Sequence, residues 1–240
     1  MKIKLIFSYD GSRFLGSASQ PNKINIQDAL SKALNHLGII EKPLFASRTD
    51  KGVHAFRAVA SVHCGDHFDD LLWLKNKINV FTKPYLYIKN IIRVNEDFQP
   101  RFDARFREYR YIFNHSLYDP RMSSYFYFYP ILDLSQLNEL LKLFIGKKDF
   151  KFFKKEGGDT KTTIRTIYDA RAYRYKAFTI VTIKANSFLR SQIRLMLSAI
   201  LNVLNNKITK SQLIEQINAK KNHSRTLIKP NGLYLSRIIY

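Results

Sequence analysis

One aspartate lies among cations in the segment Ser47–Ala55, which reads SRTDKGVHA. Asp50 follows Arg48 and precedes Lys51, and positively charged neighbours favour the ionised form of a carboxyl group. An ionised carboxylate repels phosphate, so Asp50 is a better candidate for a reacting group than for a phosphate ligand. The same residues also suit an ordinary turn after a strand, because Thr, Asp and Gly are common turn residues.

Arginines and aromatic residues are interleaved in a second segment, Phe98–Tyr111, which reads FQPRFDARFREYRY. In an extended strand Arg107, Tyr109 and Tyr111 share one face. A guanidinium and two phenols on one surface would suit phosphate contact and base stacking. Spacing alone favours the simpler alternative, in which the aromatic residues form the buried side of a sheet, because aromatic residues are common in strands.

The composition is strongly basic and typical of a folded protein. The 240 residues include 40 Lys and Arg against 19 Asp and Glu, which gives a formal net charge of +21 and a pI near 10.0. Such a charge attracts polyanions and favours nucleic acid as a partner, although a solvated lysine-rich surface has the same composition. Hydrophobic residues make up 45% of the chain, which is enough for a packed core and excludes a disordered basic tail.

The cysteine count and the apolar runs predict a cytoplasmic protein. The single cysteine, Cys64, excludes an internal disulfide, and no Cys/His cluster has zinc-binding spacing. We therefore expect a reducing compartment and a metal-free site. The first residues alternate as in a strand rather than forming a signal peptide, and no apolar run is long enough to cross a bilayer.

Hydrophobic periodicity predicts strands and helices interleaved over the whole chain. Strands are expected at residues 1–7, 44–47, 58–64, 85–94, 106–114, 163–173, 175–185 and 233–239. Helices are expected at residues 25–38, 69–78, 133–146, 188–204 and 209–218. The predicted fold class is α+β with α/β-type halves at 1–104 and 105–240. Each half is a mostly antiparallel or mixed sheet backed by helices, and the halves are expected side by side around a basic cleft.

The segment Ser47–Ala55 resembles the G-R-T-D-x-G-V-H-A signature of the TruA family of tRNA pseudouridine synthases, with Ser47 in place of the first Gly. The resemblance runs over nearly the full length. Further segments stand in family order at Tyr9–Ser12, Ile26–Leu30, Arg101–Phe102, Tyr109–Tyr111, Asp149–Phe150 with Phe153, Thr163–Ile167, Lys184–Leu189 with Arg194, and Gly232–Leu235. The resemblance to this family implies the pseudouridine synthase fold and a reaction that needs no cofactor and no metal.

Two departures from the family pattern concern the substrate rather than the acid. The family usually follows its Tyr-Asp-Gly turn with G-W-Q-x-Q, whereas this chain has Ser17 and Ala18 in place of the Trp and the first Gln. Ala58 stands where the family usually has Gln. We therefore expect activity to be kept and the range of substrates to differ.

The resemblance also implies catalytic roles. Asp50 corresponds to the aspartate that acts on a flipped-out uridine, either by attacking the ribose anomeric carbon or through a glycal route. Arg194 resembles its salt-bridge partner, supplied from a distant helix. Tyr109 is expected to cover the target base, with removal of the carbon-five proton as a further candidate role. Arg48 resembles the arginine that holds the displaced nucleotide.

The implied partner is the anticodon arm of tRNA, with uridines 38, 39 and 40 as substrates. Recognition is expected to rest on shape and backbone contacts, for which the candidate phosphate ligands are Arg101, Arg105, Arg107 and Arg165. The family is homodimeric, and the aromatic segment Tyr125–Tyr129 is either part of such an interface or a buried strand.

Two other functions fit parts of the sequence. A non-catalytic RNA-binding module or RNA chaperone would explain the charge and the aromatic residues, but not an acid in a cationic segment. A nuclease would need paired carboxylates or a histidine pair near Asp50, and the sequence offers neither. We interpret His54 and His63 as structural.

Overall fold

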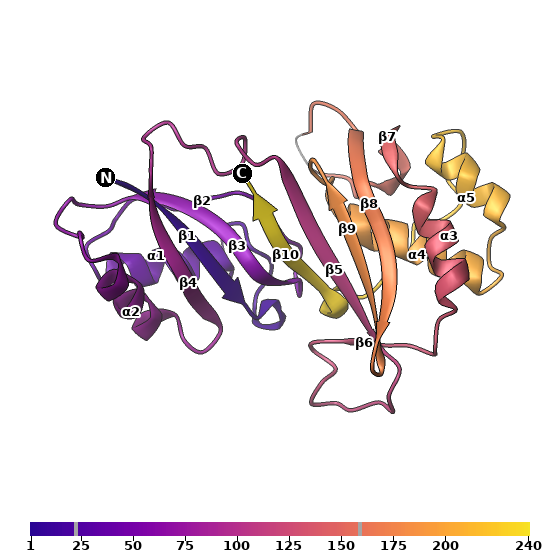
Figure 1. Cartoon of the computed structure of the whole chain (residues 1–240), viewed down its shortest axis with the longest axis horizontal. Coiled ribbons are helices and arrows are strands. Elements are labelled where there is room, and N and C mark those ends of the chain that lie inside the picture. The colour runs from indigo at the N-terminus through magenta and orange to yellow at the C-terminus, as the bar shows by residue number, and fades with distance from the viewer. Residues whose placement is uncertain (22–23, 158–159) are drawn as a thin grey trace. The chain divides into compact units, whose positions relative to one another are not determined.

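Two compact units make up the computed structural model, which describes residues 1–21, 24–157 and 160–240 (Figure 1). The first unit contains Met1–Arg105 together with Tyr234–Tyr240, and the second contains Phe106–Leu233. The last strand of the chain is therefore part of the unit that the first strand begins.

The first unit is a mixed sheet with two helices. In chain order its elements are β1 (Lys2–Tyr9), η1 (Gly11–Arg13), α1 (Ile26–Asn35), β2 (Leu44–Phe45), β3 (His54–His63), α2 (Leu71–Thr82), β4 (Leu86–Val94) and β10 (Leu233–Ile239). β1 lies between β4 and β3 and is antiparallel to both. β10 runs parallel to the start of β3, and β2 is antiparallel to its end.

Alternation along β1 decides which face of this sheet is covered. Ile3, Leu5 and Phe7 are fully buried, whereas Lys4 and Ile6 between them are only half-buried on the opposite face. Both helices begin at side-chain caps. Asn25 accepts a hydrogen bond from a backbone N–H of α1, and Asp70 accepts two from α2.

An asparagine on α2 attaches that helix to the sheet. The Asn79 side chain donates to the Ile88 carbonyl at 2.9 Å and accepts from the Ile88 N–H at 2.6 Å. Both groups lie in the interior, where an unmade hydrogen bond is costly, so the pair defines the position of the helix on β4.

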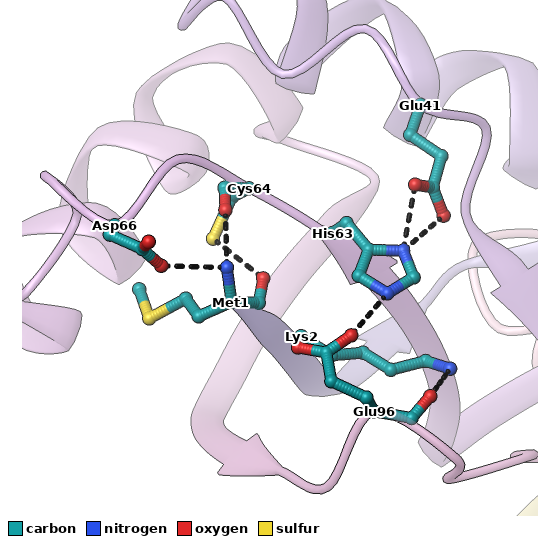
Figure 2. A network of polar contacts seen from close by, with 7 residues as sticks. All are labelled: Met1, Lys2, Glu41, His63, Cys64, Asp66 and Glu96. Carbon is teal, nitrogen blue, oxygen red and sulfur yellow. Dashed lines mark hydrogen bonds and ion pairs between the residues drawn. The ribbon is translucent and has the colours of Figure 1, made fainter.

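A network of polar contacts surrounds the start of β1 and the end of β3 (Figure 2). The imidazole of His63 lies between two carboxylates, 2.8 Å from Glu41 through Nδ1 and 2.8 Å from Glu96 through Nε2. The Met1 ammonium lies 2.8 Å from Asp66. The hydrogen bond to Glu41, followed by that to Glu96, raises the pKa of His63 above its ordinary value.

The second unit has a sheet of the same kind. Its elements are β5 (Phe106–Asn114), β6 (Tyr127–Phe128), α3 (Leu134–Lys142), β7 (Gly146–Asp149), η2 (Lys151–Phe153), β8 (Ile164–Tyr175), β9 (Phe178–Ala185), α4 (Gln192–Leu204), α5 (Lys210–Ile217) and η3 (Pro230–Gly232). The strands β5, β9, β8 and β7 are neighbours in that order and antiparallel, and β6 runs parallel to β5.

Three helices pack around this second sheet. α4 buries residues on all sides, as expected of a helix covered on more than one side. α3 repeats the device of the first unit: the Asn138 side chain donates to the Ala172 carbonyl of β8 at 3.0 Å and accepts from its N–H at 2.8 Å. α5 begins with a capping box between Thr209 and Gln212.

The predicted α+β fold class is confirmed, because the strands of each unit are mostly antiparallel and carry helices. Several element boundaries differ from prediction. β3 begins at His54 rather than at residue 58, and α4 begins at Gln192 rather than at 188. α3 ends at Lys142 rather than at 146, and the short strand β7 begins at Gly146. Within the described residues no helix has the length and apolar character that crossing a membrane requires.

Two of these boundaries have a structural cause. Ser191 adopts φ +58° just before α4, and the Gln192 side chain accepts the N–H of Leu189, so residues 188–191 form a turn instead of helix. The pairing of β1 with β3 is irregular between Phe7 and Tyr9, which breaks the alternation at the start of β3.

His63→Gln should change the pH dependence of stability. Because the folded state raises the pKa of His63, its stabilising contribution is fully present below about pH 6.5 and is lost as the pH rises through the folded-state pKa. The effect should be small, since the side chain is 43% exposed. We expect the wild-type advantage in urea unfolding to shrink between about pH 5.5 and about pH 8.5.

The matched control is His67→Gln, which removes an exposed histidine of the same unit. A wild-type advantage over His63→Gln that is constant across this range, or that grows with pH, would contradict the assigned role of the two glutamates.

Candidate active site

The acidic loop of the first unit joins β2 to β3. Asp50 is half-buried, and its neighbours Arg48 and Lys51 are exposed. The Val53 N–H donates to the Asp50 carbonyl at 3.2 Å, which closes a tight turn. Gly52 has φ +77° within this turn, a conformation that L side chains rarely adopt. The loop therefore turns sharply into β3 immediately after the acid.

The residue before the acid is held by three hydrogen bonds from β1 and the loop that follows it. The hydroxyls of Thr49 and Tyr9 lie 2.8 Å apart. The Thr49 N–H donates to the Ser17 hydroxyl at 2.7 Å, and the Ser17 N–H donates to the Thr49 carbonyl at 3.1 Å. Because Thr49 is buried, these contacts restrict the backbone from which Asp50 extends.

Two glycines allow the loop after β1 to approach the acidic loop. A Cβ atom on Gly11 would overlap the carbonyl of Val53. Gly16 has φ +117°, and a Cβ atom there would lie 3.0 Å from the Thr49 carbonyl oxygen. The Tyr-Asp-Gly turn and the acidic loop thus pack backbone against backbone, which only glycine permits at these positions.

His54 has a structural place beside this turn. Its Nδ1 accepts a hydrogen bond from the Gly11 N–H at 3.1 Å, and its ring stacks on Tyr234 at 4.7 Å and 19°. The side chain is 2% exposed. These contacts attach the turn after β1 to β3 and β10.

In the second unit, Tyr109 and Arg107 lie on the same side of β5 beside the turn that follows β9. The ring of Phe188 meets that of Tyr109 edge-on at 5.2 Å and 85°. Arg107 Nη1 donates to the Asn186 carbonyl at 2.8 Å. Asn186 in turn accepts from the Thr166 N–H at 3.0 Å, so this turn is tied to both β5 and β8.

Arg194 lies on the first turns of α4 and is oriented by the chain near η3. Its Nε donates to the Ile228 carbonyl at 2.9 Å. Arg194 also lies near enough to Tyr111 to lower the pKa of that phenol, while burial, the larger effect, raises it well above its ordinary value. Tyr111 is 1% exposed and donates its hydroxyl to the Lys229 carbonyl at 2.7 Å. Tyr111 is therefore a core residue and does not line an open surface.

The remaining arginines predicted to bind substrate have different settings. Arg101 is exposed, with its guanidinium 5.7 Å from the centroid of the Phe102 ring. Arg165 is half-buried and donates through Nη1 to the Thr162 carbonyl at 2.9 Å and to the Ile164 carbonyl at 2.6 Å. Arg107, by contrast, is 7% exposed.

Each unit thus assembles part of the predicted site. Asp50 and Arg48 share one loop of the first unit. Arg101 belongs to the same unit. Tyr109, Arg107, Arg165 and Arg194 belong to the second unit. Within the described ranges, no cluster of His, Cys, Asp and Glu side chains is suited to hold a metal ion.

Sequence reasoning did not single out the residues that hold these side chains. Phe188 and Asn186 stand out in the sequence only as part of a family segment, and Tyr9 only as part of the Tyr-Asp-Gly turn. Ser17 contacts a residue 32 positions away. No local pattern in the sequence indicates a hydrogen bond of that kind.

Mixed α/β units that present an anchored acid in a chain of net charge +21 suit the class of enzymes that act on nucleic acid. A family model described as tRNA pseudouridine synthase matches residues 140–240. The chain is 61% identical over 240 residues to the tRNA pseudouridine synthase A of Campylobacter jejuni subsp. jejuni serotype O:23/36 (strain 81-176), with all of both chains covered. The chain belongs to the tRNA pseudouridine synthase family.

More distant proteins also match. The tRNA pseudouridine synthase A of Helicobacter pylori (strain ATCC 700392 / 26695) is 41% identical over 245 residues, which covers 99% of this chain and 98% of the relative. A solved Cbf5-Nop10-Gar1 complex matches with a TM-score of 0.37 and 12% identity, over 81% of this chain and 44% of that chain. That similarity is too low to support an argument about this protein.

Gly16→Ala should slow turnover more than its effect on stability explains. The new Cβ atom would strain the backbone and press on the Thr49 carbonyl next to Asp50. Gly146→Ala is the matched control, since Gly146 has φ +104° and no described atom within 4 Å of its Cβ position. We expect both variants to lose about 1–3 kcal/mol of stability, and only Gly16→Ala to lose about tenfold or more in kcat. Equal kcat values, measured below both melting temperatures, would contradict the positioning of Asp50 by this contact.

Proposed function

We propose that this enzyme isomerises uridines 38, 39 and 40 in the anticodon arm of tRNA and that Asp50 is the group that acts on the ribose. As a member of its family the chain is an isomerase that converts uridine to pseudouridine in tRNA. The choice of Asp50 rests on the hydrogen bonds that restrain Thr49, because a reacting group needs a restrained backbone.

Two routes are open to the Asp50 carboxylate. As a nucleophile it forms a bond to the ribose anomeric carbon while the glycosidic electron pair leaves with N1 of the uracil. In the glycal route it assists the same cleavage without that covalent bond. In both, the uracil turns and its carbon five bonds to the anomeric carbon. In the first route this step breaks the bond to Asp50 and frees the carboxylate, and in the glycal route it returns to carbon two of the ribose the proton that Asp50 removed during cleavage. The proton then leaves carbon five, and N1 gains one. The atoms balance without an oxidant, a reductant or a group donor.

Tyr109 is proposed to cover the target base. Its ring is 7% exposed and is fixed by the edge of Phe188, which suits a rigid stacking surface for a flipped nucleotide. Its phenol is also the candidate for removing the carbon-five proton. Arg194 is proposed as the ion-pair partner of Asp50. Within its own unit, the hydrogen bond from its Nε to the Ile228 carbonyl restrains the guanidinium.

The remaining arginines are proposed to hold the RNA. Arg48 is exposed two residues before Asp50, which suits contact with the displaced nucleotide. Arg101 is exposed and suits a backbone phosphate. Arg107 and Arg165 are proposed to contact phosphates of the same RNA strand as Arg101. Each of these two arginines also donates a hydrogen bond to a backbone carbonyl of its own unit.

We also propose that the enzyme is cytoplasmic and homodimeric. The loop between β5 and β6 exposes large apolar side chains, with Leu117 at 94% and Tyr118 at 68%. Exposed apolar side chains near one another are typical of a surface that binds a second chain. The aromatic segment Tyr125–Tyr129 contributes to the unit itself, since Tyr127 packs against Tyr111 and Phe113.

Asp50→Asn should abolish the reaction and keep binding. The amide is neither a nucleophile nor a base, while the shape of the loop is preserved. We expect tRNA affinity within a few-fold of wild type and no tritium release from tRNA that carries labelled carbon five of uridine. Asp97→Asn, which alters an exposed aspartate of the same unit, should release tritium at the wild-type rate. Turnover by Asp50→Asn would refute the assignment and favour another acid.

Tyr109→Phe should lower turnover strongly without unfolding the protein. The phenyl ring keeps the contact with Phe188 but loses the hydroxyl. We expect unchanged circular dichroism, tRNA affinity close to wild type and a large loss in single-turnover rate. A normal rate would show that only the ring of Tyr109 matters.

A further inference from the structure

A hollow of about 320 Å³ lies on the first unit, where β1, β3 and β10 contribute side chains to one surface. Its charged lining residues are Lys4 on β1, Arg57 on β3 and Arg237 on β10. Its other lining residues are isoleucines of β1 and β10, Val59 of β3, and Tyr240. Among the described residues that line this hollow, all charged side chains are cationic, and both arginines are exposed.

Aromatic rings position one of these cations. The Lys4 ammonium lies 5.4 Å from the centroid of the Phe98 ring and 5.0 Å from that of Tyr240. The two rings contact each other at 5.1 Å, and the Tyr240 hydroxyl donates to the Pro100 carbonyl at 2.9 Å. The lysine is thus held in place by cation–π contacts before any ligand arrives.

Three cations on one small surface suit an anion with several oxygen atoms. Arginine presents a planar fork that matches phosphate oxygens in pairs, and lysine adds a point charge. The chain as a whole carries a net charge of +21, so the long-range field also favours a polyanion.

We propose that the Lys4–Arg57–Arg237 hollow binds a backbone phosphate of the tRNA at a distance from the reacting uridine. The proposal rests on the proposed function, because it takes the bound polyanion to be the tRNA substrate. Arg57 lies about 10 Å along β3 from His54, and the Asp50 loop precedes His54. The hollow therefore contacts backbone that flanks the target nucleotide, and it contributes affinity rather than chemistry.

The test is the salt dependence of tRNA binding by the full chain carrying Arg57→Gln and Arg237→Gln together. Removing one phosphate contact should reduce the slope of log K against log salt by about 0.7–0.9. Compared with wild type, we expect the slope of the double variant to be smaller by the amount for one to two phosphate contacts. We also expect its tRNA affinity to be at least about tenfold lower at low salt, and its single-turnover rate at saturating tRNA to be unchanged. The control, Lys32→Gln with Lys77→Gln, removes the same charge from exposed positions on α1 and α2.

Equal slopes and affinities for the two double variants would overturn the proposal. Arg57→Lys with Arg237→Lys keeps the charge and should restore most of the slope, which separates a phosphate site from a folding defect. Failure of the proposed function has a different signature. A wild-type protein that binds tRNA with the expected salt slope but releases no tritium would refute the activity and leave the binding site standing.

A separate observation concerns Ser17, which stands where the family pattern has Trp. Its side chain is fully buried at 0% exposure, and its hydroxyl accepts the Thr49 N–H at 2.7 Å. Its own N–H donates to the Thr49 carbonyl at 3.1 Å. A single buried residue therefore meets both polar backbone groups of Thr49, directly before Asp50.

We infer that Ser17 is a positioning residue for the Asp50 carboxylate. In Ser17→Ala the Thr49 N–H loses its acceptor, while the bond from the Ser17 N–H is kept. The acid would then sample more positions, so we expect kcat to fall by about 10- to 100-fold with KM within about twofold of wild type. Ser17→Thr, which keeps the hydroxyl, should recover part of kcat.

The matched control is Ser61→Ala on β3. Ser61 is also 0% exposed, and its hydroxyl has no hydrogen-bond partner within the described part of the chain. This variant should keep kcat and KM. Equal kcat values for Ser17→Ala and Ser61→Ala, or a Ser17→Ala variant in which KM alone changes, would overturn the inference.

Discussion

The backbone of Thr49 is the point on which the acidic loop depends. Its N–H and carbonyl both bond to Ser17, and its hydroxyl bonds to Tyr9. These groups are buried, so water is not available to replace a missing partner, and leaving one unpaired would cost more than the bond itself is worth. The loop is therefore restrained by the requirement that buried polar groups be paired.

That restraint depends on residues with a small side chain or with none. Gly11 and Gly16 bring the turn after β1 against the acidic loop, and a Cβ atom at either position would meet a backbone carbonyl. The His54 ring then closes the turn by accepting the Gly11 N–H. Close backbone approach and paired hydrogen bonds are thus two aspects of one arrangement, and neither is possible without the other.

The same principle attaches the helices to the sheets. Asn79 on α2 and Asn138 on α3 each pair with both backbone groups of one strand residue, Ile88 and Ala172 respectively. Apolar packing alone leaves a helix free to slide on a sheet, whereas a buried two-point amide contact selects one register. Both units combine an apolar core with one polar contact that specifies its geometry.

Much of the fold and part of the candidate site could be predicted from the amino-acid sequence. Periodicity predicted nearly all strands and helices, because alternation in β1 and the apolar stripe of α1 are local properties, and the caps Asn25, Asp70 and Asp133 are local as well. The acid within SRTDKGVHA and the family resemblance indicated the reaction. Charge indicated a polyanionic partner.

Tertiary structure alone decided what holds the acid and where neighbouring cations gather. Ser17 and Thr49 are distant in sequence, as are Lys4, Arg57 and Arg237, so no local spacing brings them together. The early start of β3 also follows from its pairing with β1. Short-range patterns report which face of an element is apolar, but the partner of a buried polar group is selected only when the chain closes on itself.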